Sequence, residues 1–189
     1  MNTKILLILI AAVLVTACAK VPENYEESVV AQEPGLAEDK LVSEMRLSSP
    51  AFENNADIPS KYTCDGENIN PQLNIEDVPA EAKSIVLIAD DPDASAGTWV
   101  HWVVVNIPAS ENIIIEENSV PGKQLTNDFG KTSYGGPCPP SETHRYSFKV
   151  YALDTELDLD ESKEKADAES AMKGHVIAQA QLVGLYSRG

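Results

Sequence analysis

Two short segments of the sequence hold most of the side chains that could do chemistry. The first, DDPDASAGTWVHWVVVNIP at residues 90–108, places three aspartates and a histidine beside a strongly apolar run. Alternate residues of a strand share a face, so Trp99, His101 and residue 103 would point the same way. Trp99 and His101 would then form an aromatic wall beside a titratable ring. The aspartates lead into this strand through a turn, where a carboxylate could hold an imidazole in one tautomer and raise its pKa.

The second segment, YGGPCPPSETHRY at residues 134–146, contains another histidine, His144. By the same alternation His144 and Tyr146 share a face at the start of a strand, and Arg145 points away. The glycines before them would let free backbone N–H groups approach a ligand closely. Two imidazoles, a phenol and backbone donors can surround an anionic oxygen, such as that of a phosphate ester or a carboxylate.

Each of these features also has a purely structural explanation. A lone histidine on a strand is most often a hydrogen-bonded structural residue, and Asp-Pro-Asp-Ala in most proteins forms only a turn. A Gly/Pro run is by itself more often a rigid loop than a site. The two segments indicate a binding site only when they are read together.

The N-terminus predicts an exported, membrane-anchored protein. Lys4 precedes eleven apolar residues, Ile5 to Val15, which are too few to span a bilayer and match a secretory signal core. The following Thr16-Ala17-Cys18 completes a sequence like a bacterial lipobox, in which the cysteine is lipidated and becomes the mature N-terminus. The alternative is an ordinary signal peptide with a coincidental cysteine. We expect residues 1–17 to be a lipoprotein signal peptide and Cys18 to anchor the protein to a cell-envelope membrane.

Composition bounds the rest of the chain. Residues 18–45 are acidic and show no sustained periodicity, which predicts a flexible tether to a domain at residues 46–189. An apolar content of 43% supports a real core in that domain. The net charge of −16 argues against non-specific binding of nucleic acid, because phosphate is repelled by such a surface.

The domain is expected to be mostly β, an antiparallel β-sandwich with one or two short helices near the C-terminus. Frequent Gly and Pro turns separate short apolar or alternating runs. The expected strands are residues 84–89, 99–107, 112–116 and 146–153, and the expected helix is residues 162–173. Residues 175–186 could be helix or strand, and their alternation of Gln with apolar residues favours a strand.

Cysteine counting suggests a disulfide. If Cys18 is lipidated, Cys64 and Cys138 remain, an even number in an oxidising compartment. A bond between them would close a long loop and contribute roughly 4 kcal/mol on the chain-entropy model. Two buried free thiols are the alternative.

The two chemical segments closely resemble the signature segments of the phosphatidylethanolamine-binding protein family, nearest to its bacterial and archaeal branch called Raf kinase inhibitor-like. The matching stretches are DDPDA with TWVHWVVVNIP, and YGGPCPPSETHRYSFKVYALD. Lesser similarities are IPSKYTCDGENINPQL at residues 58–73 and GHVIAQAQLVGLYSR near the C-terminus. The resemblance covers roughly residues 46–188.

This resemblance implies a β-sandwich of that family's type, with a small pocket for phosphate-type and carboxylate-type groups. It implies by position these ligand-binding residues: Asp91, Asp93, Trp99, His101, Gly136, Pro137, His144 and Tyr146. His175 and Tyr186 are further candidates, because C-terminal residues often border the pocket in the family. The resemblance also agrees with a Cys64–Cys138 disulfide that braces the pocket rim.

The leading functional hypothesis is a non-enzymatic binding module for a small anionic ligand or a phospholipid head group, with no cofactor, catalytic residue or metal site. A second hypothesis is an inhibitor or scaffold that contacts a protein partner, such as a protease, through the pocket rim. A third is a His/Asp enzyme that binds a metal or hydrolyses esters. No serine in a nucleophile-elbow context and no HExxH spacing supports the third. Kinase inhibition, known for animal relatives, is not expected of an exported protein.

Overall fold

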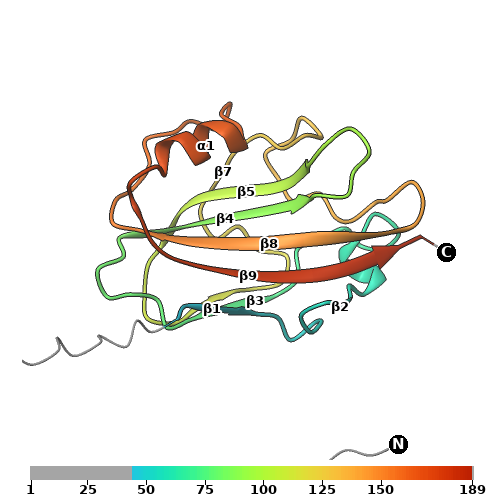
Figure 1. The fold of residues 1–189 in the computed structure, drawn as a ribbon, viewed down its shortest axis with the longest axis horizontal. Helices are drawn as coiled ribbons and strands as arrows, with labels where there is room; N and C mark the ends of the chain where they lie inside the picture. The colour runs from blue at the N-terminus through green and yellow to red at the C-terminus, as the bar shows by residue number, and fades with distance from the viewer. Residues whose placement is uncertain (1–43, 189) are drawn as a thin grey trace, which may run out of the picture. The chain divides into compact units, whose positions relative to one another are not determined.

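Residues 44–188 of the chain are described by the computed structural model and form two stacked β-sheets with one α-helix outside the larger sheet (Figure 1). The smaller sheet has the order β1 (Arg46–Ser48), β3 (Leu73–Glu76) and β6 (Ile113–Ile115), all antiparallel. The larger sheet has the order β2 (Ala56–Asp57), β9 (Val176–Ser187), β8 (Thr143–Leu153), β4 (Ser84–Asp91), β5 (Trp99–Pro108) and β7 (Lys123–Gln124). Its pairings are antiparallel except that of β2 with β9. The predicted, mostly antiparallel β-sandwich is confirmed.

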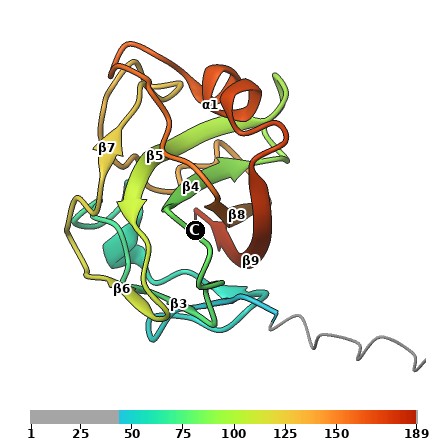
Figure 2. The ribbon, with the colours of Figure 1, turned by 90° about the vertical axis from the view of Figure 1, so that its left-hand side faces the viewer.

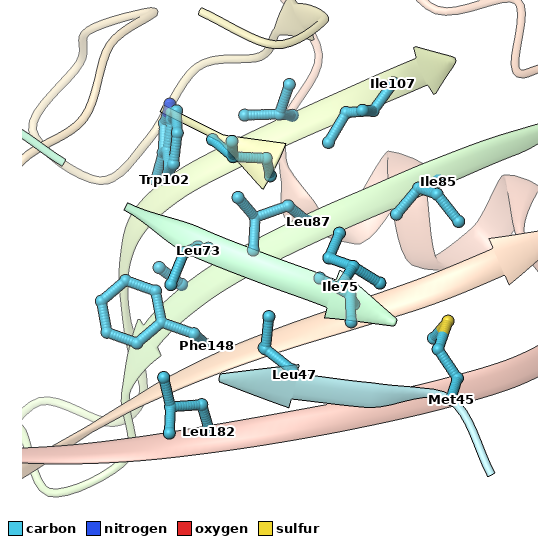
Figure 3. Close-up of a cluster of buried hydrophobic side chains, with 14 of the residues drawn as sticks. Met45, Leu47, Leu73, Ile75, Ile85, Leu87, Trp102, Ile107, Phe148 and Leu182 are labelled. Atoms are coloured by element: carbon cyan, nitrogen blue, oxygen red, sulfur yellow. The ribbon is translucent and has the colours of Figure 1, made fainter. Parts of the chain in front are cut away.

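The core has two layers, one on each face of the larger sheet. Between the sheets, side chains of β3 such as Leu73 and Ile75 pack with Leu87 of β4 and Phe148 of β8 (Figure 3). On the opposite face, β4 and β5 pack against the segment that carries α1 (Lys165–Ala171), as the layers in Figure 2 show. Every residue of β4 is buried because both faces of this strand are covered. That cover explains why its sequence is continuously apolar up to the aspartates.

A β-bulge in β5 breaks the strict alternation that the sequence predicts. Two consecutive residues of β4 pair with Val100 and Trp102, so His101 is the extra residue. Trp102 packs between the sheets, whereas Val103 packs on the α1 side with Val100. The prediction that residue 103 shares a face with Trp99 and His101 is therefore wrong.

The C-terminal part follows the prediction with shifted boundaries. The helix is shorter than residues 162–173, because Glu164 caps its N-terminus in a reciprocal capping box with Asp167. The residues just before the cap form a turn, in which the Lys163 N–H donates to the Asp160 carbonyl at 3.1 Å. Residues 176–187 form strand β9, as the alternation favoured.

The predicted signal peptide at residues 1–17, the lipidation of Cys18 and almost all of the tether at residues 18–45 lie outside the described residues. β1 begins at Arg46, where the domain is predicted to start. Across residues 44–188 there is no helix with the length and apolarity needed to span a membrane. The domain boundaries and the membrane anchor stay predictions.

Candidate ligand-binding site

A pocket of about 260 Å³ opens at one end of the larger sheet, where β4 ends and β5 and β8 begin, on the right in Figure 1. Five of the predicted ligand-binding residues line it: Asp91, Trp99, His101, His144 and Tyr146. They come from three neighbouring strands, with Asp91 of β4 directly opposite Trp99 of β5. Loop residues, among them Ser95 and Phe129, complete the wall. The fold thus brings the two sequence segments together at one place.

Asp91 holds an imidazole, as expected of a carboxylate at this turn, but the imidazole is that of His144. The Asp91 Oδ2 atom lies 2.7 Å from His144 Nδ1, and both side chains are buried. A carboxylate accepts and does not donate, so His144 carries its proton on Nδ1 and keeps Nε2 for the pocket. The other Asp91 oxygen accepts the Asp93 N–H at 2.8 Å. The pairing across the sheet was not evident from the sequence, where the aspartate precedes His101.

His101 is held by a backbone carbonyl. Its Nδ1–H donates to the carbonyl oxygen of Gly135 at 2.6 Å, which leaves Nε2 as the second ring nitrogen. Burial lowers the pKa of this imidazole, and the Gly135 carbonyl and the Asp91 charge offset the effect only in part. The neutral form with an accepting Nε2 is therefore favoured. The expectation of a raised pKa is wrong for His101.

Tyr146 presents a buried hydroxyl beside the two imidazoles. Its ring packs edge-on against His101, with 5.3 Å between the ring centroids. The hydroxyl has no hydrogen-bond partner among residues 44–188, although Asp91 and Cys138 lie near it. Burial raises the pKa of this phenol, and the negative charge of Asp91 adds to the effect. Tyr146 thus lines the pocket with a neutral phenol whose hydroxyl is closed off from solvent and is not bonded by the fold.

Asp93 does not line the pocket and instead fastens its turn to β8. Both carboxylate oxygens accept from the Arg145 guanidinium, at 2.6 and 2.9 Å, and one also accepts the Arg145 N–H at 2.9 Å. These bonds lower the pKa of Asp93 to about 2. Arg145 points away from His144 and Tyr146, as alternation predicts, and uses that position to hold the turn.

Gly135 and Gly136 do not offer free N–H groups, so that expectation is wrong. The Gly135 N–H donates to the His101 carbonyl at 3.1 Å, and the Gly136 N–H donates to Asn68 Oδ1 at 2.7 Å. Gly136 is needed for space: a Cβ atom there would lie 2.5 Å from the Tyr62 carbonyl oxygen. These two glycines let the loop pack against the strand end.

Pro137 and the two cysteines form the rim beside this loop. The Pro137 carbonyl accepts the Cys64 N–H at 3.0 Å, and a Cys64–Cys138 disulfide, with a Cα–Cα distance of 5.4 Å, crosses the same two segments. Cys138 lines the pocket, whereas Gly136 and Pro137 do not. The predicted disulfide is present and ties the pocket loop to residue 64.

The two C-terminal candidates lie at opposite ends of β9. His175 precedes the strand and pairs with Asp154 at 2.8 Å, roughly 33 Å along the sheet from the pocket. Tyr186 lies opposite His144 in the register of β8 and β9. Its hydroxyl donates to Asp65 at 2.9 Å, and its side chain does not line the pocket. His175 is thus placed away from the site and Tyr186 beside it.

Two residues that sequence reasoning missed shape the pocket from the loop after β7. The Phe129 ring packs edge-on against Trp99 and His101, with centroid distances of 5.5 and 5.3 Å. Buried Asn127 holds this loop: its NH₂ group donates to the His101 and Ser133 carbonyls, at 3.1 and 2.8 Å. Its Oδ1 accepts the N–H groups of residues 129 and 131. The Asn-Asp-Phe-Gly stretch signals a turn, but no local signal reveals these contacts.

The remaining aspartate of the first segment, Asp90, faces the α1 side. Its fully buried carboxylate accepts from Lys149 Nζ at 2.8 Å and from Lys165 Nζ at 2.6 Å. Among the described residues, no group of three or more His, Cys, Asp and Glu side chains is arranged to hold a metal ion.

A two-sheet sandwich with a small pocket at a sheet end, lined by two histidines, an aspartate and a tyrosine, is a ligand-binding fold, and the chain belongs to the phosphatidylethanolamine-binding protein family. The model of that family matches residues 48–187. A UPF0098 protein of Methanothermobacter thermautotrophicus is 51% identical over 152 residues, which cover 77% of this chain and 100% of the relative. A UPF0098 protein of Aquifex aeolicus is 48% identical, with coverages of 76% and 89%.

Solved structures agree with this assignment. The phosphatidylethanolamine-binding protein homologue CT736 of Chlamydia trachomatis matches with a TM-score of 0.74 at 42% identity, over 78% of this chain and 99% of its own. YbcL of Escherichia coli, a member of the same family, matches with a TM-score of 0.72 at 29% identity, over 77% and 99%. None of these relatives is named as an enzyme.

Proposed function

We propose that the pocket binds a small anionic ligand, of the phosphate or phospholipid head-group type, without chemical turnover. The observation that carries this proposal is the Tyr146 hydroxyl, which is buried without a partner beside His101 and His144. A buried hydroxyl without a hydrogen bond costs about 1–3 kcal/mol. A ligand oxygen that accepts from Tyr146 would recover that free energy, and His101 and His144 line the same pocket.

The charges of the pocket residues favour an anion whose binding is coupled to the uptake of a proton. The Asp91 carboxylate already accepts a hydrogen bond from buried His144, so its charge is directed at that imidazole. Neutral His101 offers only a lone pair at Nε2, because its proton is held by the Gly135 carbonyl. An anionic oxygen can bond to this nitrogen after His101 takes up a proton, and charge-assisted bonds of this kind contribute about 1.5–3 kcal/mol each.

Calorimetric titration with glycerophosphoethanolamine tests the proposal. His101→Asn and His144→Asn are the sharpest variants, because an Asn amide can keep the Nδ1-type bond to Gly135 or Asp91 while Nε2 is lost. Each variant, and Tyr146→Phe, should weaken binding by about tenfold or more. Tyr151→Phe is the matched control, since Tyr151 lies on the other face of the same strand and packs on the α1 side.

Two results would contradict the proposal. One is a parent protein that binds neither phosphomonoesters nor phosphodiesters. The other is a Tyr146→Phe protein that binds them as well as the Tyr151→Phe control does.

A further inference from the structure

A second pocket, of about 440 Å³, adjoins the first, and Phe129 and Cys138 line both. None of its fifteen lining residues is acidic, although the chain has 30 acidic residues. Its one charged lining residue is Lys131, for which no ion pair is found among residues 44–188. The surroundings therefore favour a group that is negative or rich in hydrogen-bond acceptors.

The orientation of two amide side chains in this pocket is fixed by the fold. Asn68 Oδ1 accepts the Gly136 N–H at 2.7 Å, and Gln124 Oε1 accepts the Trp102 indole N–H at 2.6 Å. Both partners can only donate, so the amide oxygens must face them and the NH₂ groups must face the other way. Within the described part of the chain neither NH₂ group has a protein acceptor, and neither is buried.

A third amide in the same pocket, that of Asn70, is used by the fold at both ends. Asn70 Oδ1 accepts the Ser119 N–H at 3.0 Å, and its NH₂ group donates to the Glu116 carbonyl at 2.9 Å. The NH₂ groups of Asn68 and Gln124 and the Lys131 ammonium thus remain as donors for a ligand. A carboxylate, which only accepts, can use all three of these donors.

An apolar rim accompanies the donors. Val120 is 65% exposed and Phe129 is 41% exposed, and both line this pocket. Exposed apolar side chains beside a polar site indicate a ligand that carries an apolar group next to its polar one.

We propose that this second pocket binds the carboxylate of a small amphiphilic ligand. The carboxylate accepts from Lys131 Nζ and from the NH₂ groups of Asn68 and Gln124, while an adjoining apolar group covers Val120 and Phe129. One ammonium and two neutral amides match the single charge of a carboxylate better than the double charge of a phosphate monoester. The two pockets share Phe129 and Cys138, but none of the three proposed donors lines the first pocket.

Titration of the ¹⁵N-labelled protein with N-acetylphenylalanine, followed by NMR, tests this. The side-chain NH₂ signals of Asn68 and Gln124 should shift, with a Kd of about 1 mM or tighter. N-acetylphenylalaninamide, which lacks the charge, should bind more weakly by about tenfold or more. A tripeptide that ends in phenylalanine distinguishes the two sources of such a carboxylate: tighter binding than the free acid assigns a peptide C-terminus, and equal or weaker binding assigns a small organic acid.

Isosteric variants make the test specific. Asn68→Asp and Gln124→Glu keep the oxygen that Gly136 or Trp102 needs and replace the ligand-facing donor by an acceptor. Each should lower the affinity for N-acetylphenylalanine by about tenfold or more and leave the affinity for glycerophosphoethanolamine within about twofold of the parent value. Asn54→Asp is the matched control, since Asn54 Oδ1 also accepts a backbone N–H, from Val183, outside both pockets.

The proposal is overturned if the amide probe binds as well as the acid, or if no NH₂ signal of Asn68 or Gln124 shifts. It is also overturned if Asn54→Asp lowers the affinity for N-acetylphenylalanine as much as Asn68→Asp does, because added charge alone would then explain the loss. Failure of the phosphodiester to bind the parent protein would count against the first pocket only.

Discussion

Asp90, Asp91 and Asp93 lie together in the sequence, yet each carboxylate has different partners in the structure. Asp90 binds two lysines on the α1 side, Asp91 binds His144 in the pocket, and Asp93 binds Arg145 at the surface. Successive strand residues point to opposite faces, so the side chains of Asp90 and Asp91 are separated by the sheet itself. At the residue scale, function depends on which polar atoms are left to bond a ligand after these internal bonds are made.

Tyr146→Phe should leave the free energy of unfolding unchanged or raise it by up to about 1 kcal/mol, because it removes a buried hydroxyl that has no partner. Tyr134→Phe is the comparison, since the Tyr134 hydroxyl donates to the Tyr62 carbonyl at 3.0 Å. It should lower the free energy of unfolding by about 1–2 kcal/mol. Urea denaturation of both proteins without ligand measures the difference, and an equal loss for both would show that Tyr146 is bonded inside the fold.

The lowered pKa of His101 predicts opposite effects of pH on stability and on binding. Without ligand, the unfolded state takes up a proton near pH 6.5 while folded His101 does not, so its stabilising contribution is lost as the pH falls below about 6.5. Binding that requires proton uptake should instead strengthen as the pH falls from 8 to 6, by up to about tenfold per pH unit.

A phosphodiester is the right probe for this dependence, because it has no titration of its own in that range. His101→Asn should flatten both trends. The groups that face His101 are Asp91, His144 and Tyr146, so His144→Asn is titrated in parallel to separate the two imidazoles. An affinity for the diester that is independent of pH in the parent protein would contradict proton uptake.

At the scale of elements, the pocket depends on how the loop after β7 is fixed to β5. The Asn127 side chain makes four hydrogen bonds with backbone groups, one of them to the His101 carbonyl. Through them a single buried side chain sets the position of Phe129 in the first pocket and of Lys131 in the second.

Asn127→Asp should lower the free energy of unfolding by about 3 kcal/mol, because two donors are lost and a carboxylate is placed against two carbonyl oxygens. It should also lower the affinity of both pockets for their ligands. Asn106→Asp is the control: its amide bonds the backbone of Leu157 in both directions, and it lines neither pocket. It should also lower stability, but it should leave both affinities unchanged. Loss of affinity in both variants alike would mean that general instability, and not the loop, weakens binding.

At the scale of the whole molecule, the domain is expected to act at a membrane surface. Export and lipidation at Cys18, followed by an acidic tether at residues 18–45, would hold the pockets near lipid head groups. The net charge of −16 would keep the domain from adsorbing to anionic lipid by itself. The anchor would then supply the membrane affinity that the domain's surface charge opposes.

Cys18→Ser should move the protein from the membrane fraction to the soluble fraction of the producing cell, because the acyl chains would be lost. Mass spectrometry of the parent protein should find a mature N-terminus at Cys18 with acyl modification. The variant should bind glycerophosphoethanolamine with unchanged affinity. A parent protein with an unmodified cysteine, or one cleaved elsewhere, would exclude the anchor.

The sequence by itself determined the sandwich, the longer strands β4, β5, β8 and β9 with the short β6, and five of the residues that line the pocket. The short strands β1, β2, β3 and β7 were not predicted. Alternation placed Trp99 with His101 and His144 with Tyr146, because side chains alternate between the two faces along a regular strand. The resemblance joined the two segments and agreed with the Cys64–Cys138 pair. These features are encoded locally or in recognisable segments, so no tertiary information was needed.

Only the tertiary structure decided the partners. Asp91 meets His144 across 53 residues, a β-bulge moves Val103 to the other face, and Phe129 enters from a distant loop. Register, bulges and loop packing depend on the pairing of whole strands, which no single segment specifies. The same packing buries His101 and lowers its pKa, and it uses the glycine N–H groups that the sequence suggested were free for a ligand.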